Sequence, residues 1–336
     1  MPHGVAGSTH VLRPMPCTSI PRARPLQLAY LHAPSHPDVH LRTLLMPPPI
    51  RSILLPSERR GSHQHYYHFL LGNVLPLFAL PPALREGRQW MFCDPGPLAS
   101  MLRELGVEPI EWSAFRSLTR HVRKFSLWPK SALHADRYRH LPHRLPLPLA
   151  AGLEAMRLEG FDGPDGHVGE GIHRGVRGVL DRLGRRTPPP VDILLVGRGK
   201  PDPFYATRAL YRGAGNSRRS LTNLAAIGAA LSDIPFATVR TVVLEGLSLR
   251  DQIDLFSGAR LVVAQHGAAL ANLVWCSPRT RVLEIVPRVP SGVYRDHFER
   301  LSLGFGLRYR RLDQDGPHAA VAPEAVAQAA RALLDA

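Results

Sequence analysis

One stretch, residues 261–287, restricts the possible folds of this 336-residue chain more than any other. It opens with the apolar run LVVA at 261–264, which is typical of a buried strand. A polar interruption at 265–267 follows, and residues 268–275 then predict a helix. Strand character returns at 282–286. A strand, a tight turn, a helix and a second strand predict one βαβ unit of a parallel sheet.

The turn of this unit has the chemistry of an anion site. Backbone N–H groups at the start of a helix, together with the positive end of the helix dipole, attract phosphate. Gly267 lets the backbone approach a ligand closely, and His266 can donate a hydrogen bond to an anion. Glu284, inside an apolar run, predicts a carboxylate that is paired or that accepts hydrogen bonds from ribose hydroxyls. The alternative is a βαβ unit with a tight turn and no ligand.

The flanking sequence repeats the same alternation of strands and helices. Ser220 or Thr222 is the expected N-cap of one helix, and Ser248 to Asp251 has the capping-box pattern that begins another. The alternation predicts a doubly wound parallel sheet, an α/β fold. Its further strands are expected at 191–196, 239–244 and 307–312, and its further helices at 221–231, 248–256, 295–301 and 323–334.

The first half of the chain shows a second α/β pattern, which predicts a separate Rossmann-like half. Strands are expected at 52–55 and 90–93, and helices at 67–75, 98–105, 150–158 and 171–183, with Pro76 bending or ending the first helix and Gly106 ending the second. The predicted organisation is an arm without order at 1–25, a first Rossmann-like domain at 26–184, a linker at 185–190, a second Rossmann-like domain at 191–322 and a C-terminal helix at 323–336.

Composition narrows the class of partner. The formal net charge is +15, but only three of the 42 basic residues are lysines and the arginines are scattered along the chain. A nucleic-acid binder would concentrate its charge on a stripe, so we expect no nucleic-acid partner; anionic small molecules and peripheral contact with a membrane surface remain compatible. The sequence holds no apolar run of the roughly 18–20 residues that a membrane span needs. Three widely spaced cysteines suit a reducing compartment, and we expect a cytoplasmic protein, including the inner face of the membrane.

Polar residues follow three successive predicted strands: Arg198, Glu245 and His266. In an open parallel sheet, ligands bind beyond the carboxyl ends of the strands, so these residues predict a binding site. Arg218 and Arg219, just before a predicted helix, could clamp a diphosphate. The chain lacks the GxxxxGK[ST] phosphate loop and lacks GxGxxG after a strand.

Residues 245–287, EGLSLRDQIDLFSGARLVVAQHGAALANLVWCSPRTRVLEIVP, resemble the C-terminal region of family-61 glycosyltransferases over their whole length without a gap. Residues 216–223, NSRRSLTN, are similar to the family's Arg-Arg…Asn segment, and Arg198 stands where the family has an arginine after the preceding strand. Residues 66–70, YYHFL, followed by Leu75-Pro76, resemble the family's YYHWL…LP helix. The chain is thus identified as a bacterial-type member of this family.

The resemblance implies a GT-B-like architecture, two Rossmann-like halves facing a cleft, and an inverting enzyme that needs no metal ion or other cofactor. It implies that the domain at 26–184 is the acceptor side and that the domain at 191–322 binds the nucleotide-sugar. Its donor would be a nucleotide-sugar, most simply UDP-linked, and its acceptor a hydroxyl of a saccharide, as in the synthesis of cell-surface polysaccharide. His68 is the expected general base and Asp94 the alternative base. The residues expected to bind the donor are Arg198, Arg218, Asn223, Glu245, His266, Gly267, Ala268, Asn272 and Glu284.

Two other hypotheses remain open. The family has an acidic residue before Leu-Pro where this chain has Gly72-Asn73, and an acidic residue after the Asn where this chain has Leu224. These departures suit a catalytically degenerate protein that binds a nucleotide or glycan. Asp313 and Asp315 have the DxD spacing that can hold a divalent metal on a nucleotide diphosphate, although the metal-independent family argues against it.

Overall fold

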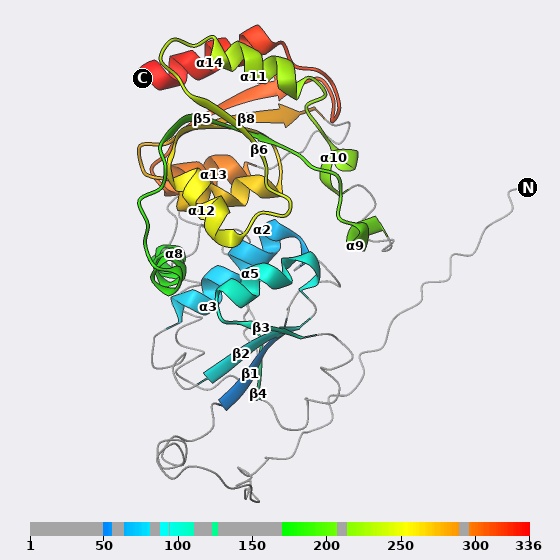
Figure 1. Ribbon diagram of the computed structural model, residues 1–336, viewed down its shortest axis with the longest axis vertical. Helices are drawn as coiled ribbons and strands as arrows, with labels where there is room; N and C mark the ends of the chain where they lie inside the picture. The colour runs from blue at the N-terminus through cyan, green and yellow to red at the C-terminus, as the bar shows by residue number, and fades with distance from the viewer. Residues whose placement is uncertain are drawn as a thin grey trace, which may run out of the picture. The chain divides into compact units, whose positions relative to one another are not determined.

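Two parallel sheets organise the described part of the chain, which in this computed structural model comprises residues 50–55, 64–80, 88–93, 95–110, 123–126, 170–206, 214–288 and 296–336 (Figure 1). All of these residues belong to one structural unit, Pro48–Ala336. The arm expected at 1–25, the helix expected at 150–158 and the candidate base Asp94 lie outside the described residues. The domain and linker boundaries stay predictions.

The sheet of the second half has five parallel strands in the order β6-β5-β7-β8-β9. Numbered from the first of them, this is the order 2-1-3-4-5 of a doubly wound fold, whose strand order reverses between β5 and β7. The crevice outside such a reversal is where open α/β sheets bind ligands. The strands are β5 (Val191–Gly197), β6 (Val239–Val243), β7 (Ala259–Gln265), β8 (Arg281–Pro287) and β9 (Arg308–Gln314).

Helices cover both faces of this sheet. Leu261 and Val263 of β7 pack into one apolar cluster with α11 (Leu224–Ser232) and α14 (Pro323–Asp335). Val262 and Ala264 point the other way, because side chains alternate along a strand, and pack with α12, η6 and α13. The predicted double winding is therefore confirmed. The helices of the second face are α12 (Leu249–Ser257), the 3₁₀ helix η6 (Ala268–Trp275) and α13 (His297–Gly304).

The sheet of the first half has four parallel strands in the order β3-β2-β1-β4, which confirms the predicted second α/β pattern. Its strands are β1 (Ile50–Leu55), β2 (Arg88–Cys93), β3 (Glu108–Ile110) and β4 (Arg123–Ser126). The helices are α2 (Tyr66–Phe69), the π-helix η2 (Leu70–Val74), α3 (Leu75–Ala79), the 3₁₀ helix η3 (Gly96–Leu98), α5 (Ala99–Glu104) and α8 (Glu170–Leu183).

Pro76 was predicted to bend or end the first helix, and it does not end it: the chain continues as helix through residue 79. The turn before it is a π-helix, in which the Leu75 N–H donates to the Leu70 carbonyl five residues earlier. A proline in a regular α-helix has no N–H to donate and clashes with the carbonyl four residues before it. The wider turn relieves that conflict, and the chain continues as α3.

Three helix starts also test the sequence. Ser248 caps α12 as predicted: its Oγ accepts from the Asp251 N–H (3.0 Å). In contrast, α11 begins at Leu224, with Asn223 at the N-cap position, so neither Ser220 nor Thr222 caps it. Residues 268–275 form a 3₁₀ helix where the pattern predicted an ordinary helix; the Leu270 N–H donates to Gly267 O, three residues back.

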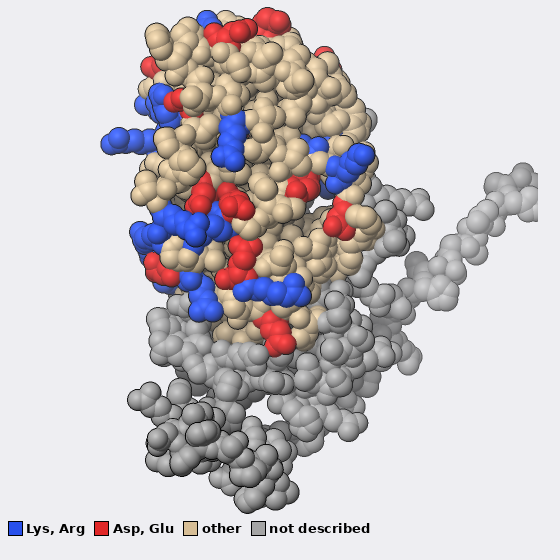
Figure 2. Space-filling model, viewed as in Figure 1, with Lys and Arg blue, Asp and Glu red and all other residues tan. Residues whose placement is uncertain are grey.

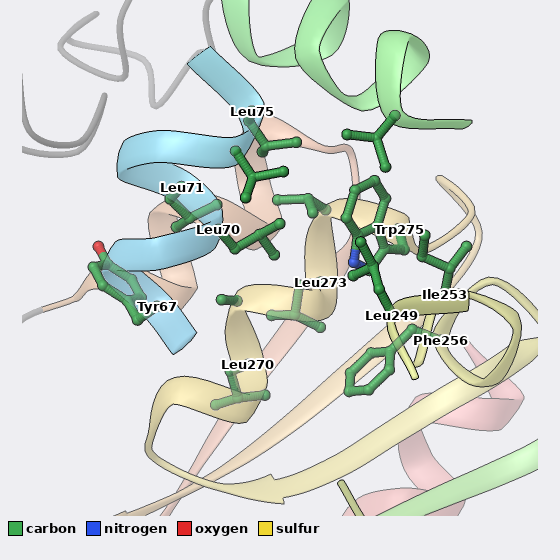
Figure 3. Close-up of a cluster of buried hydrophobic side chains, with 14 of the residues drawn as sticks. Tyr67, Leu70, Leu71, Leu75, Leu249, Ile253, Phe256, Leu270, Leu273 and Trp275 are labelled. Carbon is green, nitrogen blue, oxygen red and sulfur yellow. The ribbon is translucent and has the colours of Figure 1, made fainter. Parts of the chain in front are cut away.

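One hydrophobic cluster joins elements of both halves (Figure 3). Because residues far apart in sequence bury their apolar surface together, this cluster makes the two halves mutually dependent for stability. Its labelled members are Tyr67, Leu70, Leu71 and Leu75 from the first half, Leu249, Ile253 and Phe256 from α12, and Leu270, Leu273 and Trp275 from η6.

Helices α3 and α8 approach each other so closely that α8 needs glycine at the contact. A Cβ added at Gly175 would lie 2.5 Å from Leu75 O, and one at Gly178 would lie 2.4 Å from Phe78 O. Backbone oxygens cannot move aside as the end of a flexible side chain can. The two glycines therefore set the distance between the helices.

Gly175→Ala should lower the free energy of unfolding by about 1–3 kcal/mol, because the added methyl group overpacks the contact. Gly228→Ala in α11 is the matched control: its Cβ would meet Thr241 Oγ1 at 3.4 Å, an ordinary contact. This control should gain up to about 1 kcal/mol from helix propensity. Urea unfolding of both variants measures the difference, and equal stability of the two would contradict the explanation.

Candidate active site

The three polar residues predicted at strand ends come together because β5 lies between β6 and β7 in the sheet. Arg198 directly follows β5, and His266 directly follows β7. Glu245 follows β6, and its carboxylate lies against Gly199, where an added Cβ would be 3.2 Å from Glu245 Oε2. The strand-order reversal between β5 and β7 thus lies between Arg198 and His266, as the ligand-binding rule for open sheets requires.

Two guanidinium groups meet at the backbone carbonyl of His266. Arg198 Nη2 donates to His266 O at 3.0 Å, and Arg219 Nη1 donates to the same oxygen at 3.0 Å. Arg198 also donates through Nη1 to Gly215 O (3.3 Å), at the start of α10 (Gly215–Arg218). The result is two positive charges beside the first residues of η6.

Gly267 is required here for space. Its φ of 163° is extended backbone that any residue can adopt. A Cβ at this position, however, would lie 1.6 Å from Arg198 Nη2. The absence of a side chain lets the Arg198 guanidinium lie against the turn that precedes η6.

The His266 ring is held by a buried carboxylate. His266 Nδ1 donates to Glu284 Oε1 at 2.5 Å, and the Tyr309 hydroxyl donates to Glu284 Oε2 at 2.7 Å. Burial, followed by the nearby Glu284, raises the pKa of the Tyr309 phenol well above its ordinary value, so the phenol stays protonated and donates. The ring of Phe298 packs edge-on against His266, with 5.1 Å between ring centroids. Together these contacts fix the orientation of the imidazole.

Two alternatives were expected for the carboxylate of Glu284: a pair with another side chain, or hydrogen bonds from the ribose hydroxyls of the donor. The structure shows the pair: both carboxylate oxygens are engaged by His266 and Tyr309, and the side chain is buried. Glu284 therefore holds the His266 ring and the Tyr309 hydroxyl in place.

Asn272, also expected at the donor, is a fully buried junction between elements. Its Oδ1 accepts from Tyr66 Oη (2.6 Å) and Trp275 Nε1 (3.0 Å). Its Nδ2 donates to Gln252 Oε1 (3.0 Å) and Ala269 O (3.1 Å). An amide can make about four hydrogen bonds. All four are used inside the protein, so direct contact with a donor does not fit this geometry.

Arg218 and Asn223, which were also expected to bind the nucleotide-sugar donor, have other surroundings in the structure. Of the two adjacent arginines, the exposed one is Arg218, and the buried Arg219 is the one that reaches His266. Asn223 binds the backbone of Val321 through both amide atoms, with Nδ2 donating to Val321 O (2.7 Å) and Oδ1 accepting from Val321 N (3.2 Å). It ties the chain before α14 to the start of α11. Ala268 lies at the first position of η6, where helix N–H groups lack partners within the helix.

The candidate base His68 reaches this neighbourhood through a chain of aromatic rings. Its ring contacts that of Tyr67 edge-on at 5.1 Å, Tyr67 contacts Phe298 at 5.9 Å, and Phe298 contacts His266. His68 is half-buried on α2. Helix α2 thus connects His68, through the rings of Tyr67 and Phe298, to His266.

The DxD residues are paired with arginines. Asp313 Oδ1 accepts from Arg311 Nε (2.7 Å), and Arg288 lies 3.3 Å from Asp315 and 3.6 Å from Asp313. Arg311, more than Arg288, holds the pKa of the Asp313 carboxyl below its usual range. Among the described residues, no group of three or more His, Cys, Asp or Glu side chains is arranged to hold a metal ion.

Figure 2 shows acidic and basic side chains intermixed on the visible face, where no large single-sign patch stands out. In the described part of the chain, no helix has the length and apolar character needed to span a membrane.

The fold and site define a class: an α/β protein in which two arginines and the start of a helix meet at the strand-order reversal of a parallel sheet. The family model for Glycosyltransferase 61 matches residues 66–283. The chain belongs to glycosyltransferase family 61, which confirms the family resemblance and, at the level of the family, the enzyme class.

A curated relative is the beta-1,2-xylosyltransferase RCN11 of Oryza sativa subsp. japonica, 34% identical over 76 residues. That match covers 22% of this chain and 14% of the rice protein. Two solved structures have a low structural similarity to this chain. A family 9 glycosyl transferase from Veillonella parvula DSM 2008 has a TM-score of 0.35 and 10% identity, covering 86% of this chain and 98% of that one. The E. coli heptosyltransferase WaaC with ADP has a TM-score of 0.38 and 12% identity, covering 85% and 98%. TM-scores this low assign neither donor nor acceptor to this chain.

Gly267→Ala should displace the Arg198 guanidinium and weaken anion binding while leaving stability almost unchanged, because the displaced atoms are the end of a flexible side chain. Isothermal titration with pyrophosphate should show a dissociation constant raised about tenfold or more, the value of one charge-assisted hydrogen bond. Gly316→Ala is the control, since an added Cβ there meets nothing within 4 Å. Equal pyrophosphate affinity in the two variants would show that the turn before η6 is not the anion site.

Proposed function

We propose that this chain is an inverting, metal-independent glycosyltransferase that moves a sugar from a nucleotide-sugar, most simply a UDP-sugar, to a hydroxyl of a saccharide. The observation that supports this most directly is the meeting of Arg198 and Arg219 at His266 O, beside the first residues of η6. This concentration of positive charge is complementary to a diphosphate.

The chemical demand on the donor site is to stabilise the departing nucleoside diphosphate. Negative charge grows on the diphosphate oxygens as the glycosidic bond breaks, and preorganised donors aimed at that charge lower the barrier. Two guanidinium groups and the N–H groups at the start of η6 would supply the positive charge that a divalent metal supplies in other transferases. The arginine pairing of Asp313 and Asp315 is consistent with this proposal.

His266 would add a directed hydrogen bond. Glu284 holds Nδ1, so Nε2 is the ring nitrogen on the opposite side of the imidazole. A histidine in which a carboxylate fixes one nitrogen presents the other with a defined tautomer and direction. The tautomer with its proton on Nδ1 leaves Nε2 without one, so Nε2 can donate to a phosphate oxygen of the donor only when the ring carries both protons. We assign that doubly protonated form to the donor complex, and Glu284 and Tyr309 to positioning the ring.

Inversion needs one displacement in which a base removes the proton of the acceptor hydroxyl. His68 is our candidate base, because α2 carries it to within two ring contacts of Phe298, which touches His266. Asp94 stays the alternative base. We place the reaction in the cytoplasm, at the inner face of a bacterial membrane, where acceptors for cell-surface polysaccharide would be met.

A second candidate is a degenerate family member that binds nucleotide or glycan without turnover. Gly72 and Asn73, which replace the family's acidic position, are both buried in the π-helix, and Asn73 Nδ2 donates to His68 O (2.9 Å). Neither residue is a carboxylate that could serve as base.

The test is a thermal-shift panel of nucleoside diphosphates and nucleotide-sugars, with and without EDTA, on wild type, His266→Ala and the control His173→Ala. His173 lies on α8 and packs against Phe305, so its variant reports any general effect of losing a histidine. A ligand at 100 times its Kd adds about 2.7 kcal/mol, an easily measured shift. We expect one nucleotide to stabilise wild type and the control but not His266→Ala, with no effect of EDTA.

Turnover is measured on the same samples by following release of the nucleoside diphosphate and the anomeric configuration of the product by NMR. An inverted product supports the transferase; binding without any turnover, including hydrolysis, supports the degenerate protein. Absence of a shift with every ligand at millimolar concentration would refute both. A shift that EDTA abolishes would direct attention back to Asp313 and Asp315.

A further inference from the structure

The side chain of Gln265 is a buried amide at the carboxyl end of β7, on the residue before His266. It is 3% exposed. Its Nε2 donates to Ser220 O (3.1 Å), Gln314 Oε1 (2.6 Å) and Pro317 O (3.2 Å). Ser220 in turn follows Arg219, which reaches His266.

These three acceptors fix the direction of the amide. Exchanging the amide oxygen and nitrogen would aim an oxygen at three oxygens, so only one orientation is favourable. In that orientation Gln265 Oε1 is buried and accepts no hydrogen bond from any residue that the structure describes. Buried acceptors without a partner are rare in folded proteins, and each calls for a specific explanation.

The neighbouring amide shows the contrast. Gln314 is also buried, yet its Oε1 accepts from Gln265 and its Nε2 donates to Ser220 O (3.2 Å) and Ala319 O (2.6 Å). The network therefore satisfies the amide of Gln314, whereas Oε1 of Gln265, the residue adjacent to His266, accepts no hydrogen bond within the described residues.

A carbonyl oxygen repels phosphate and attracts N–H or O–H groups. The missing partner is thus a hydrogen-bond donor located next to a site built for a diphosphate. A nucleoside has both kinds of donor, in its ribose hydroxyls and in the N–H groups of its base, and it is covalently attached to the diphosphate.

We propose that Gln265 Oε1 accepts a hydrogen bond from the nucleoside of the donor and so helps to select it. This inference rests on the proposed function, because it assumes a nucleotide at the His266–Gly267 turn. It assigns Gln265 to nucleoside recognition, and the arginines and His266 to the diphosphate.

The test compares Gln265→Met with the matched control Gln314→Met, which removes the partner amide of the same network. Each is titrated calorimetrically with pyrophosphate, which has no nucleoside, and with the nucleoside diphosphate that wild type prefers. Loss of one hydrogen bond should raise the Kd of Gln265→Met for the nucleoside diphosphate about tenfold, with the Kd for pyrophosphate unchanged. The control should bind both ligands in the wild-type ratio.

Ligand changes on wild type give an independent reading, which also decides the matter where Gln265→Met does not fold. The 2′-deoxy, 3′-deoxy and base N-methylated forms of the preferred nucleotide each remove one donor. A tenfold loss with one of them identifies the group that Gln265 accepts from.

Three outcomes would overturn the inference. If wild type binds neither pyrophosphate nor any nucleotide, the proposed function fails first. If wild type binds both but Gln265→Met keeps the wild-type ratio of the two affinities, Oε1 does not contact the nucleoside. If none of the modified nucleotides loses affinity, the partner of Oε1 is water.

Discussion

The buried amide of Asn272 is the contact on which the arrangement of the site depends. Its four hydrogen bonds join Tyr66 of α2, Gln252 of α12, and Ala269 and Trp275 of η6. A buried polar group that is fully satisfied fixes one arrangement of its neighbours, because any shift would leave a donor or acceptor unpaired at high cost. The position of η6, and therefore of the His266–Gly267 turn before it, follows from this junction.

A second contact between elements secures the same region. The Glu104 carboxylate at the end of α5 accepts from the N–H groups of Leu249 (3.0 Å) and Arg250 (3.1 Å), the first residues of α12. Arg250 Nη1 donates to Gly184 O (2.6 Å) just after α8, and Arg182 of α8 donates to Leu105 O (3.0 Å) just after α5. Three helix ends thus cap one another in a ring, each placing charge where the helix dipole favours it. The helices that carry the site are therefore held together at their ends by charged groups.

The sequence alone predicted the positions of the strands, because these follow from the periodicity of apolar residues. It did not predict which of two similar residues is buried, or which residue of a motif contacts a ligand. Continuous apolar runs located β5, β7 and β8, because these central strands bury both faces. The edge strands β6 and β9 are largely exposed, and the alternation of strands with helices located them. Nothing in the adjacent pair Arg218–Arg219 indicated which one would be buried, since α10 is a single turn that ends between them. Asn272 and Glu284 lie in motif positions, and a motif does not distinguish a residue that touches the ligand from one that holds its neighbours. The partners that decide this, Tyr66 and Tyr309, are 206 and 25 residues away.

Helix α2 of the first half connects these contacts to the candidate base, His68. In three successive residues, Tyr66 bonds the Asn272 junction, Tyr67 packs against Phe298, and His68 follows. The π-helix that comes next turns Asn73 back onto the carbonyl of His68, which fixes the backbone at that residue. Single π turns recur at functional sites because they reorient side chains without ending a helix. The same contacts that set the position of the His266 turn therefore set the position of His68, and the spacing between the candidate base and the candidate donor site becomes a property of the folded core.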